Sequence, residues 1–510
     1  MSMVSNQLTN LDSRATLDAL RELRTDVDAE ARDLFAKWQS QIVRRAFCNG
    51  AFNMACYLAL RRRDLRELQT ALTPLGLSSL GRSESRVLPN LDAAIATLER
   101  VCAEPTPSDY PPARAHTRGT TILTRESDRV FGVPDVRRRV RIMVTFPLEA
   151  ASDYEFVRDL VAHGMDAARI NCAHDTPDDW GAMIRHVQRA VIEVGRPVKI
   201  HMDLGGPKPR TADVTLRGKD ERLYIDDRIL LTRAAPTDDD ADDVKIAARV
   251  RCTLPQVLDQ LQVGHTVWID DGKIGTRVEA KTDLGVMLRV THAREKGERL
   301  RDEKGLNFPD TDVELSALTD DDLSALDFVV THADLIGYSF VQTADDVARL
   351  HAEIAWRIGS RAGEKRTHPP AIIAKIETRR AIRNLPEIIV SAAGQTPFGV
   401  MIARGDLGVE VGYERMAEIQ EEILWLCEAA HVPVIWATEV LERFVDKGTP
   451  SRSEMTDAAM SARAECVMLN KGEYVREAVT ILDNVLKRMQ EHQTKKTPTL
   501  RALNAWAETI

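Results

Sequence analysis

From residue 141 onwards, short apolar runs alternate with helical segments of about a dozen residues, and this alternation is the strongest constraint on the fold. Repeated βα units of this kind form α/β folds with parallel strands. Eight units predict a closed (β/α)8 TIM barrel, although a doubly wound open sheet would give the same alternation. The predicted strands begin near Ile142, Ala167, Val198, Leu335, Ile372, Val400, Val434 and Cys466.

One segment, residues 212–301, interrupts the alternation with short strands and hairpin turns such as HTVWIDDGKIGTRVEA. It follows the third predicted strand, so it emerges from the reactive face of the barrel. We expect a β-rich lid domain that covers the site and excludes water. The acidic run at 237–243 within it could bind a cation, but an exposed loop is the favoured interpretation. The barrel domain is then predicted over 139–211 and 302–492, with a capping box at Thr319 and Asp322.

The remaining segments lie at the two ends of the chain. Residues 1–103 are predicted to be an all-helical region, with helices at 52–72 and 87–102 that serve for docking or homo-oligomer contacts. A linker is predicted over 104–138, with its proline-rich start at 104–119 extended. Residues 493–510 form a polar tail.

Bulk properties limit the partners of this 510-residue chain. Its formal net charge of −9 argues against a nucleic-acid polymer or an anionic membrane as partner, so any phosphate site must be local. Seven scattered cysteines without a C-x-x-C pair indicate reduced thiols. No signal pattern or long apolar run is present. We expect a soluble, cytoplasmic protein.

The chemistry concentrates in residues 371–412. Lys375 and Glu377 share one face at the carboxyl end of a predicted strand, because strand side chains alternate. The next strand ends in Arg404-Gly405-Asp406-Leu407-Gly408, where backbone N–H groups can approach an anion before a helix begins. Alone, each piece is more often a salt bridge or a turn. Together on a βα repeat they indicate a site for a metal-bound anion.

An ordered series of motifs resembles the pyruvate kinase family over about residues 139–490. The series comprises GMDAARINCAH (164–174), MDLGGPKPRT (202–211), VGHTVWIDDGKI, KGLNFP (304–309), AKIET, MIARGDLGVE and WATEVLE (436–442). The resemblance implies phosphoryl transfer from phosphoenolpyruvate to ADP, giving pyruvate and ATP, a reaction of glycolysis. It also implies a Mg²⁺ or Mn²⁺ cofactor.

The resemblance and the chemistry of this reaction together assign roles to particular residues. A metal that bridges phosphate and carboxylate needs two carboxylate ligands, for which Glu377 and Asp406 are the candidates. A fixed cation, Lys375, would stabilise the transferring group. The substrate carboxylate would lie on the N–H groups of Gly405 and Asp406 beside Thr438, which would also help to protonate the enolate.

Further residues are assigned by resemblance alone. Arg169 and Arg210 match the family's phosphate clamps. Arg169, His174 and Lys304 match its nucleotide side, although His174 is equally well explained as a structural histidine. The nucleotide end departs from the family pattern at TFPLEA (145–150), Gln342 and NKGEYV (470–475).

A second departure concerns the monovalent cation that many members of the family need. Asn171 and Asp203 match family residues that bind this cation. Ala173, however, stands where the family has a serine ligand, and Lys208 stands where it has a glutamate that supports the cation site. A lysine ammonium would repel a second positive charge nearby. We therefore expect turnover that does not require potassium.

The chain also stops near the end of the barrel, so the resemblance implies no C-terminal regulatory domain and no sugar-phosphate activation through it. Two alternatives remain open. One is another metal-dependent barrel enzyme acting on phosphoenolpyruvate or pyruvate, such as an aldolase or lyase. The other is a non-catalytic ligand-binding regulator.

Overall fold

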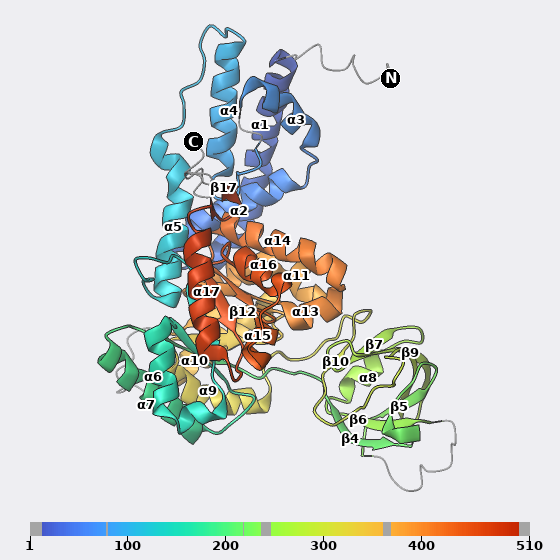
Figure 1. The fold of residues 1–510 in the computed structure, drawn as a ribbon. Coiled ribbons are helices and arrows are strands. Elements are labelled where there is room, and N and C mark those ends of the chain that lie inside the picture. Colours follow the sequence, from blue (N-terminus) through green and yellow to red (C-terminus); the bar gives the residue numbers. More distant parts are fainter. Residues whose placement is uncertain (1–12, 78–79, 218, 236–245, 361–368, 499–510) are drawn as a thin grey trace, which may run out of the picture.

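A computed structural model describes residues 13–77, 80–217, 219–235, 246–360 and 369–498 of the protein. Eight parallel strands form a closed barrel in the order β1-β15-β14-β13-β12-β11-β3-β2 (Figure 1). The pairing of Arg141 with Cys466 closes the cylinder, which confirms the TIM barrel over the open sheet. The strands are β1 Arg141–Thr145, β2 Ala167–Asn171, β3 Lys199–Asp203, β11 Leu335–Tyr338, β12 Ala371–Ile376, β13 Phe398–Ala403, β14 Val434–Ala437 and β15 Cys466–Leu469.

Helices cover the outside of the barrel and bury the outward-facing side chains of the strands. Helix α9 begins with the predicted capping box, in which the Thr319 hydroxyl and the Asp322 carboxylate each bond the other residue's backbone N–H. The barrel helices are α6 Tyr154–His163, α7 Pro177–Val194, α9 Asp320–His332, α10 Ala344–Ser360, α11 Arg379–Arg383, α12 Leu385–Ala393, α13 Arg404–Val411, α14 Tyr413–Ala430, α15 Glu442–Lys447, α16 Arg452–Ser461 and α17 Val475–Met489.

The β-rich insertion is a separate sheet with its own apolar core, connected to the barrel by two chain crossings (Figure 1). Its strand order is β10-β7-β8-β9-β5-β6-β4. The acidic run at 237–243 lies outside the described residues. The elements are β4 Thr211–Leu216, β5 Arg228–Thr232, β6 Ala248–Cys252, α8 Gln256–Gln260, β7 Thr266–Ile269, β8 Ile274–Thr282, β9 Gly285–His292 and β10 Leu306–Asn307.

The N-terminal region is helical, with two differences from the expectation. The helix predicted over 52–72 is broken between Arg61 and Arg66, and the extended conformation predicted for 104–119 is wrong from Ala113, where a long helix begins. The prolines of that stretch precede the helix, because Pro112 stands at its N-cap. The helices are α1 Ser13–Trp38, α2 Cys48–Arg61, α3 Arg66–Leu72, α4 Val87–Val101 and α5 Ala113–Phe131.

The helical region docks on the barrel itself, at the amino-terminal end of the strands. Phe131, at the end of α5, packs in the barrel interior with residues such as Met143 and Ile373. On α2, the Asn53 amide donates to the carbonyl of Ala429 at 2.8 Å. The lid domain is connected to the barrel at the opposite, carboxyl-terminal end of the strands.

The chain leaves the barrel after α17 and forms a short hairpin, β16 Gln493–Thr494 with β17 Thr497–Pro498.

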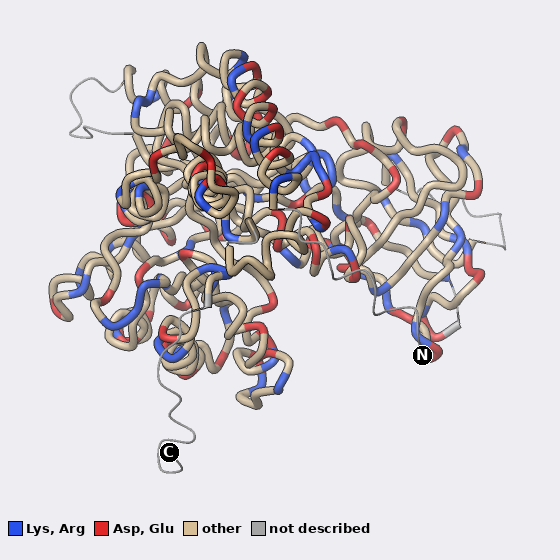
Figure 2. The backbone as a smooth tube through the Cα atoms, turned by 90° about the horizontal axis from the view of Figure 1, so that it is seen from above, with Lys and Arg blue, Asp and Glu red and all other residues tan. Residues whose placement is uncertain are grey.

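Within the described residues, no helix is long and apolar enough to cross a membrane. Acidic and basic residues are interspersed over barrel, lid and helical region in the view of Figure 2.

Candidate active site

Lys375 and Glu377 form the centre of the site at the carboxyl end of β12. The Lys375 ammonium lies 3.1 Å from Glu377 Oε1 and donates to the Ser339 hydroxyl at 2.7 Å. The Phe340 N–H donates to Glu377 Oε2 at 2.6 Å, and the Glu377 side chain is only 2% exposed. The predicted pair therefore shares one face and lies almost out of contact with water.

Asp203 connects this pair to the neighbouring strands. Its carboxylate, fully buried at the end of β3, accepts from Arg169 Nη2 at 2.6 Å and from His201. Lys375 Nζ lies 3.6 Å from the same carboxylate. Arg169 also donates to the Thr145 hydroxyl at 2.9 Å, so its guanidinium is fixed from both sides.

The first turn of α13 supplies the second carboxylate. Asp406 accepts from the Lys208 ammonium at 2.6 Å, an ion pair that joins the loop after β3 to α13. The Gly405 N–H, predicted to face a substrate carboxylate, donates here to the Thr438 hydroxyl at 2.9 Å. Arg404 holds the Thr438 loop by donating to its carbonyl at 2.6 Å.

The charged groups of the site shift one another's pKa values. Burial raises the pKa of Glu377, and the nearby Asp406 carboxylate adds to the effect, although Lys375 opposes both. Burial would lower the pKa of Lys375, but the carboxylates of Glu377 and Asp203 outweigh it, and that pKa is raised. Asp203 is buried as well, yet Arg169, Lys375 and His201 hold its pKa well below the ordinary value. Lys375 is thus kept cationic, whereas the Glu377 and Asp406 carboxylates repel each other.

That repulsion fits a divalent cation. Glu377 and Asp406 offer hard oxygen donors, the ligand type that Mg²⁺ and Mn²⁺ prefer. No cluster of three His, Cys, Asp or Glu side chains suited to a metal occurs in the described part of the chain. A metal on these two carboxylates would therefore complete its coordination with substrate and water oxygens.

Three predicted residues lie outside this centre, Arg210 and Lys304 toward the lid and His174 on the barrel. Arg210 pairs with Gly305 in an isolated β-bridge and donates to the carbonyl of Glu303 at 3.0 Å. The Lys304 ammonium lies 3.2 Å from Asp270. In the loop after β2, burial lowers the pKa of His174, and the charges of Lys471 and Arg210 add to this.

The predicted monovalent-cation residues are divided between two places. Asn171 Oδ1 accepts from the Ala173 N–H at 3.2 Å, and Asp203 is occupied by the cations described above. Lys208 is paired with Asp406, on the side of the metal candidates. Gly305 makes room for it, since a Cβ there would lie 2.9 Å from Lys208 Cε.

Sequence reasoning missed two buried polar residues of the site. His201 lies two positions before Asp203 on β3, so strand alternation alone would have placed both on one face. Ser339 follows β11, accepts from Lys375 and donates to the carbonyl of Leu204 at 2.7 Å. A single serine after a strand carries no signal of this role.

Fold and site together define an enzyme of the lidded (β/α)8-barrel class. The family profile "Pyruvate kinase, barrel domain" matches residues 137–479. The chain belongs to the pyruvate kinase family.

Individual relatives agree with the profile. The chain is 31% identical over 361 residues to "Pyruvate kinase" of Dictyostelium discoideum, and this alignment covers 69% of this chain and 66% of that protein. It is 30% identical over 368 residues to "Pyruvate kinase" of Thermococcus litoralis, covering 71% of each. Human "Pyruvate kinase PKLR" is 31% identical over 364 residues, 68% of this chain and 59% of that protein. The alignments thus span roughly two thirds of the relatives' length.

Proposed function

We propose that this protein transfers the phosphoryl group of phosphoenolpyruvate to ADP, giving pyruvate and ATP. The observation that carries the proposal is the buried Lys375–Glu377 pair, 3.1 Å apart, beside Asp406 at the carboxyl end of a barrel of the pyruvate kinase family. A fixed ammonium next to Glu377, with the Asp406 carboxylate nearby, suits a substrate that carries both a phosphate and a carboxylate. The seven cysteines, all free of disulfides, support a cytoplasmic location.

The proposed role of Lys375 follows from charge. During phosphoryl transfer, negative charge spreads over the equatorial oxygens of the moving group, and catalysis is largely electrostatic. Lys375 is held cationic and reaches the site at the end of β12. Arg169, fixed by Asp203 and Thr145, adds a second positive charge on the neighbouring side. Glu377 and Asp406 would hold a Mg²⁺ or Mn²⁺ ion, which supplies further neutralisation of phosphate and carboxylate charge.

We propose that Thr438 takes part in the protonation of the enolate. Its backbone has a left-handed conformation, with φ of 58°, and its hydroxyl accepts from Gly405 and donates to the carbonyl of Ala437 at 2.8 Å. A substrate carboxylate that takes over the N–H groups of Gly405 and Asp406 would release this hydroxyl. Thr438 could then orient the water that protonates the enolate carbon.

The nucleotide is proposed to bind between barrel and lid, with Lys304 and Arg210 at the lid side and His174 at the barrel side. The lowered pKa of His174 suits a neutral imidazole that accepts or donates one hydrogen bond. Because Lys304 and Arg210 are now bound to lid groups, closure over a nucleotide would exchange those contacts for phosphate contacts.

We further propose that turnover does not need potassium. Lys208 and Lys375 already bring two ammonium groups to the carboxylates of the site. In a potassium-free buffer, adding the ion should leave the rate nearly unchanged. An activation of about tenfold, roughly 1.4 kcal/mol, would contradict this part of the proposal.

The test of the proposed function is direct product analysis. Purified protein is incubated with phosphoenolpyruvate, ADP and Mg²⁺, and pyruvate and ATP are quantified separately. Equal amounts of both products, lost on chelation of the metal, are expected. Pyruvate formed without ADP would indicate a lyase-type enzyme instead, and saturable binding without products would indicate a regulator.

A further inference from the structure

An open pocket lies between α5 and the start of α2, in the helical region. Its volume is about 1610 Å³, including solvent at its open side. Helix α5 lines it from Pro112 to Arg129, almost its whole length, and Ala46 and Asn49 line it from the other side. In Figure 1, α5 runs along the outside of the molecule from the helical region to the barrel. We call this pocket the α5 groove.

Four arginines of α5 form a row along the groove. They are separated by four, seven and four residues, a spacing that keeps them on one face of a helix. All four are exposed. The row covers fifteen residues, which is about 22 Å of helix at a rise of about 1.5 Å per residue. The arginines are Arg114, Arg118, Arg125 and Arg129.

Of the described residues that line the α5 groove, one is acidic, and it is already paired. Glu126 accepts from Arg44 and from Arg129 Nη1, the latter at 3.3 Å, and its side chain is only 12% exposed. Within the described part of the chain, the other three arginines of the row form no ion pair. The row is therefore an uncompensated positive surface on a chain whose formal net charge is −9.

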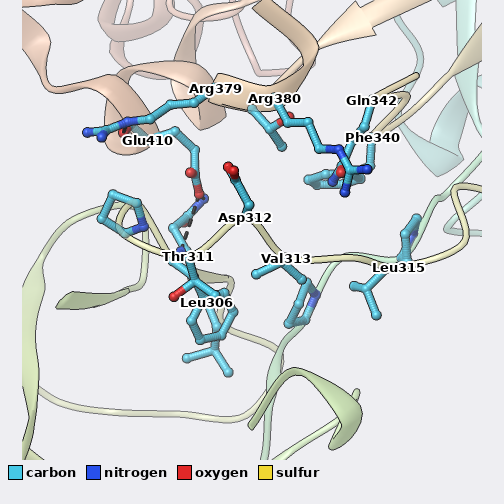
Figure 3. Close-up of a pocket in the computed structure, with 16 residues that line it drawn as sticks. Leu306, Thr311, Asp312, Val313, Leu315, Phe340, Gln342, Arg379, Arg380 and Glu410 are labelled. Carbon is cyan, nitrogen blue, oxygen red and sulfur yellow. Dashed lines mark hydrogen bonds between the residues drawn. The ribbon is translucent and has the colours of Figure 1, made fainter. Parts of the chain in front are cut away.

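The pocket where the lid joins the barrel has a different charge pattern (Figure 3). Its wall combines the carboxylates of Asp312 and Glu410 with the guanidinium groups of Arg379 and Arg380. Acids and cations are equal in number there, so that pocket favours neither sign. The α5 groove, in contrast, favours a partner that carries negative charge.

An apolar strip lies beside the arginine row. Ala115 and Ile122 are seven residues apart on α5, so they share one face, and both are half-buried in the groove. Ala46 adds an exposed apolar side chain from the other wall. Covering such surface contributes about 25 cal/mol per Å². A partner that carries charge alone would leave this strip in contact with water.

Both walls of the α5 groove are fixed to the barrel. Helix α5 ends with Phe131 in the barrel interior. On the other wall, Arg44 donates its backbone N–H to the carbonyl of Gly394 at 2.7 Å and its guanidinium to the carbonyl of Thr396 at 3.3 Å. The groove is thus preformed, and binding would require little ordering of its backbone.

We propose that the α5 groove docks an acidic amphipathic helix of a partner protein. The apolar face of that helix lies on Ala115 and Ile122, and its carboxylates pair with the arginine row. A helix of about fifteen residues matches the length of the row. A small anion would reach only one or two of the arginines. Because each exposed ion pair contributes little, affinity comes from several pairs together with apolar burial.

The docked helix would lie away from the proposed active site. Helix α5 reaches the barrel at the amino-terminal end of its strands, whereas Lys375 and Glu377 lie at the carboxyl end of β12. A partner protein would therefore hold the enzyme in place and leave the lid free to move. Docking does not rest on the proposed function, so the experiment measures binding without turnover.

Fluorescence anisotropy on the full chain tests the proposal with a labelled helical peptide of about 18 residues, with leucines on one face and glutamates on its flanks. Two matched peptides are the controls, one with lysine in place of each glutamate and one with serine in place of each leucine. We expect saturable binding of the first peptide at micromolar concentration, weaker as salt rises, and at least about tenfold weaker binding of both controls. Absence of binding, or equal binding of either control, would overturn the proposal.

Charge reversal locates the site. The double variant Arg118→Glu with Arg125→Glu should weaken binding of the acidic peptide at least about tenfold. Arg185→Glu with Arg415→Glu is the control with the same change in net charge, because these arginines are also exposed and without an ion pair among the described residues, but lie on α7 and α14. It should keep the affinity of the parent protein. Equal affinity of the two double variants would contradict the assignment.

Two further measurements complete the test. Thermal melting confirms that both double variants fold. Light scattering distinguishes a partner protein from a second copy of this chain, and we expect Arg118→Glu with Arg125→Glu to leave the molecular mass unchanged. An oligomer that this double variant dissociates would assign the α5 groove to a second copy and overturn the proposal.

Discussion

The Lys208 ammonium lies 2.6 Å from the Asp406 carboxylate, so a lysine occupies one of the two proposed metal ligands. Each of the two side chains is about 20% exposed, and the pair joins residues 198 positions apart in the sequence. A divalent cation bound to Asp406, as proposed, would compete with this ammonium for the same oxygen. Metal affinity in the absence of substrate should therefore depend on Lys208.

Lys208→Met should strengthen the binding of Mn²⁺ to the substrate-free protein. Two unit charges about 4 Å apart interact by about 1 kcal/mol in water-like surroundings, so we expect roughly a fivefold lower dissociation constant. Electron paramagnetic resonance of free Mn²⁺ measures it without turnover.

Lys487→Met is the matched control, because that lysine is also paired with an aspartate and is 28% exposed, but it lies on α17. It should leave Mn²⁺ binding unchanged. Gly305→Ala should act like Lys208→Met in weaker form, since its methyl group would displace Lys208 Cε. Unchanged or weaker Mn²⁺ binding in Lys208→Met would contradict the competition.

Gly50→Ala should destabilise the docking of the helical region on the barrel. A Cβ at Gly50 would lie 2.2 Å from the carbonyl oxygen of Ala430, an impossible contact with backbone. Overpacking of this kind costs about 1 to 3 kcal/mol. Denaturant unfolding measures the loss.

The control is Gly359→Ala, because that glycine lies in α10 with no heavy atom within 4 Å of an added Cβ. Alanine there should be neutral or stabilise by up to about 1 kcal/mol through helix propensity. Equal unfolding free energies for the two variants would argue against tight docking at Gly50.

Glu428, on α14 near the helical region, should make stability depend on pH. Burial raises the pKa of its carboxyl to about 7, with Lys495 opposing. The folded state then favours the protonated form, so this contribution is present in full below about pH 4.5 and is lost as pH rises through 7. Glu428→Gln, which cannot ionise, should raise the free energy of unfolding at pH 8 by about 1 to 3 kcal/mol and change it little at pH 5.

Denaturation at the two pH values measures the difference. Glu422→Gln, at an exposed position on the same helix, should show the same effect at both. A Glu428→Gln variant whose advantage over the parent does not grow between pH 5 and pH 8 would disprove the assignment.

How much could be predicted from sequence depends on the range of the interactions. The repeated βα units and the Lys375–Glu377 pair follow from local periodicity, because buried parallel strands are continuous apolar runs and side chains alternate along β12. Closure of the barrel depends on the pairing of β1 with β15, which are far apart in the sequence. The ion pair of Lys208 with Asp406 depends on how two distant loops meet, and no local pattern encodes it. Ser339 was missed for the same reason.

In the helical region, local composition led to a wrong prediction. The prolines between residues 105 and 112 suggested an extended segment, but α5 begins directly after them and ends with Phe131 inside the barrel. Tertiary packing of a few apolar residues outweighed the composition of the preceding stretch.

The most direct test of the central claim is the rate of phosphoryl transfer in Lys375→Met. Single-turnover mixing of phosphoenolpyruvate with enzyme, ADP and Mg²⁺ measures the chemical step, with Lys199→Met, at the opposite end of a barrel strand, as control. Loss of the cation at the developing charge should slow transfer at least about a hundredfold, roughly 2.7 kcal/mol, while the control keeps the parent rate. A Lys375→Met enzyme that transfers the phosphoryl group as fast as the control would contradict the account.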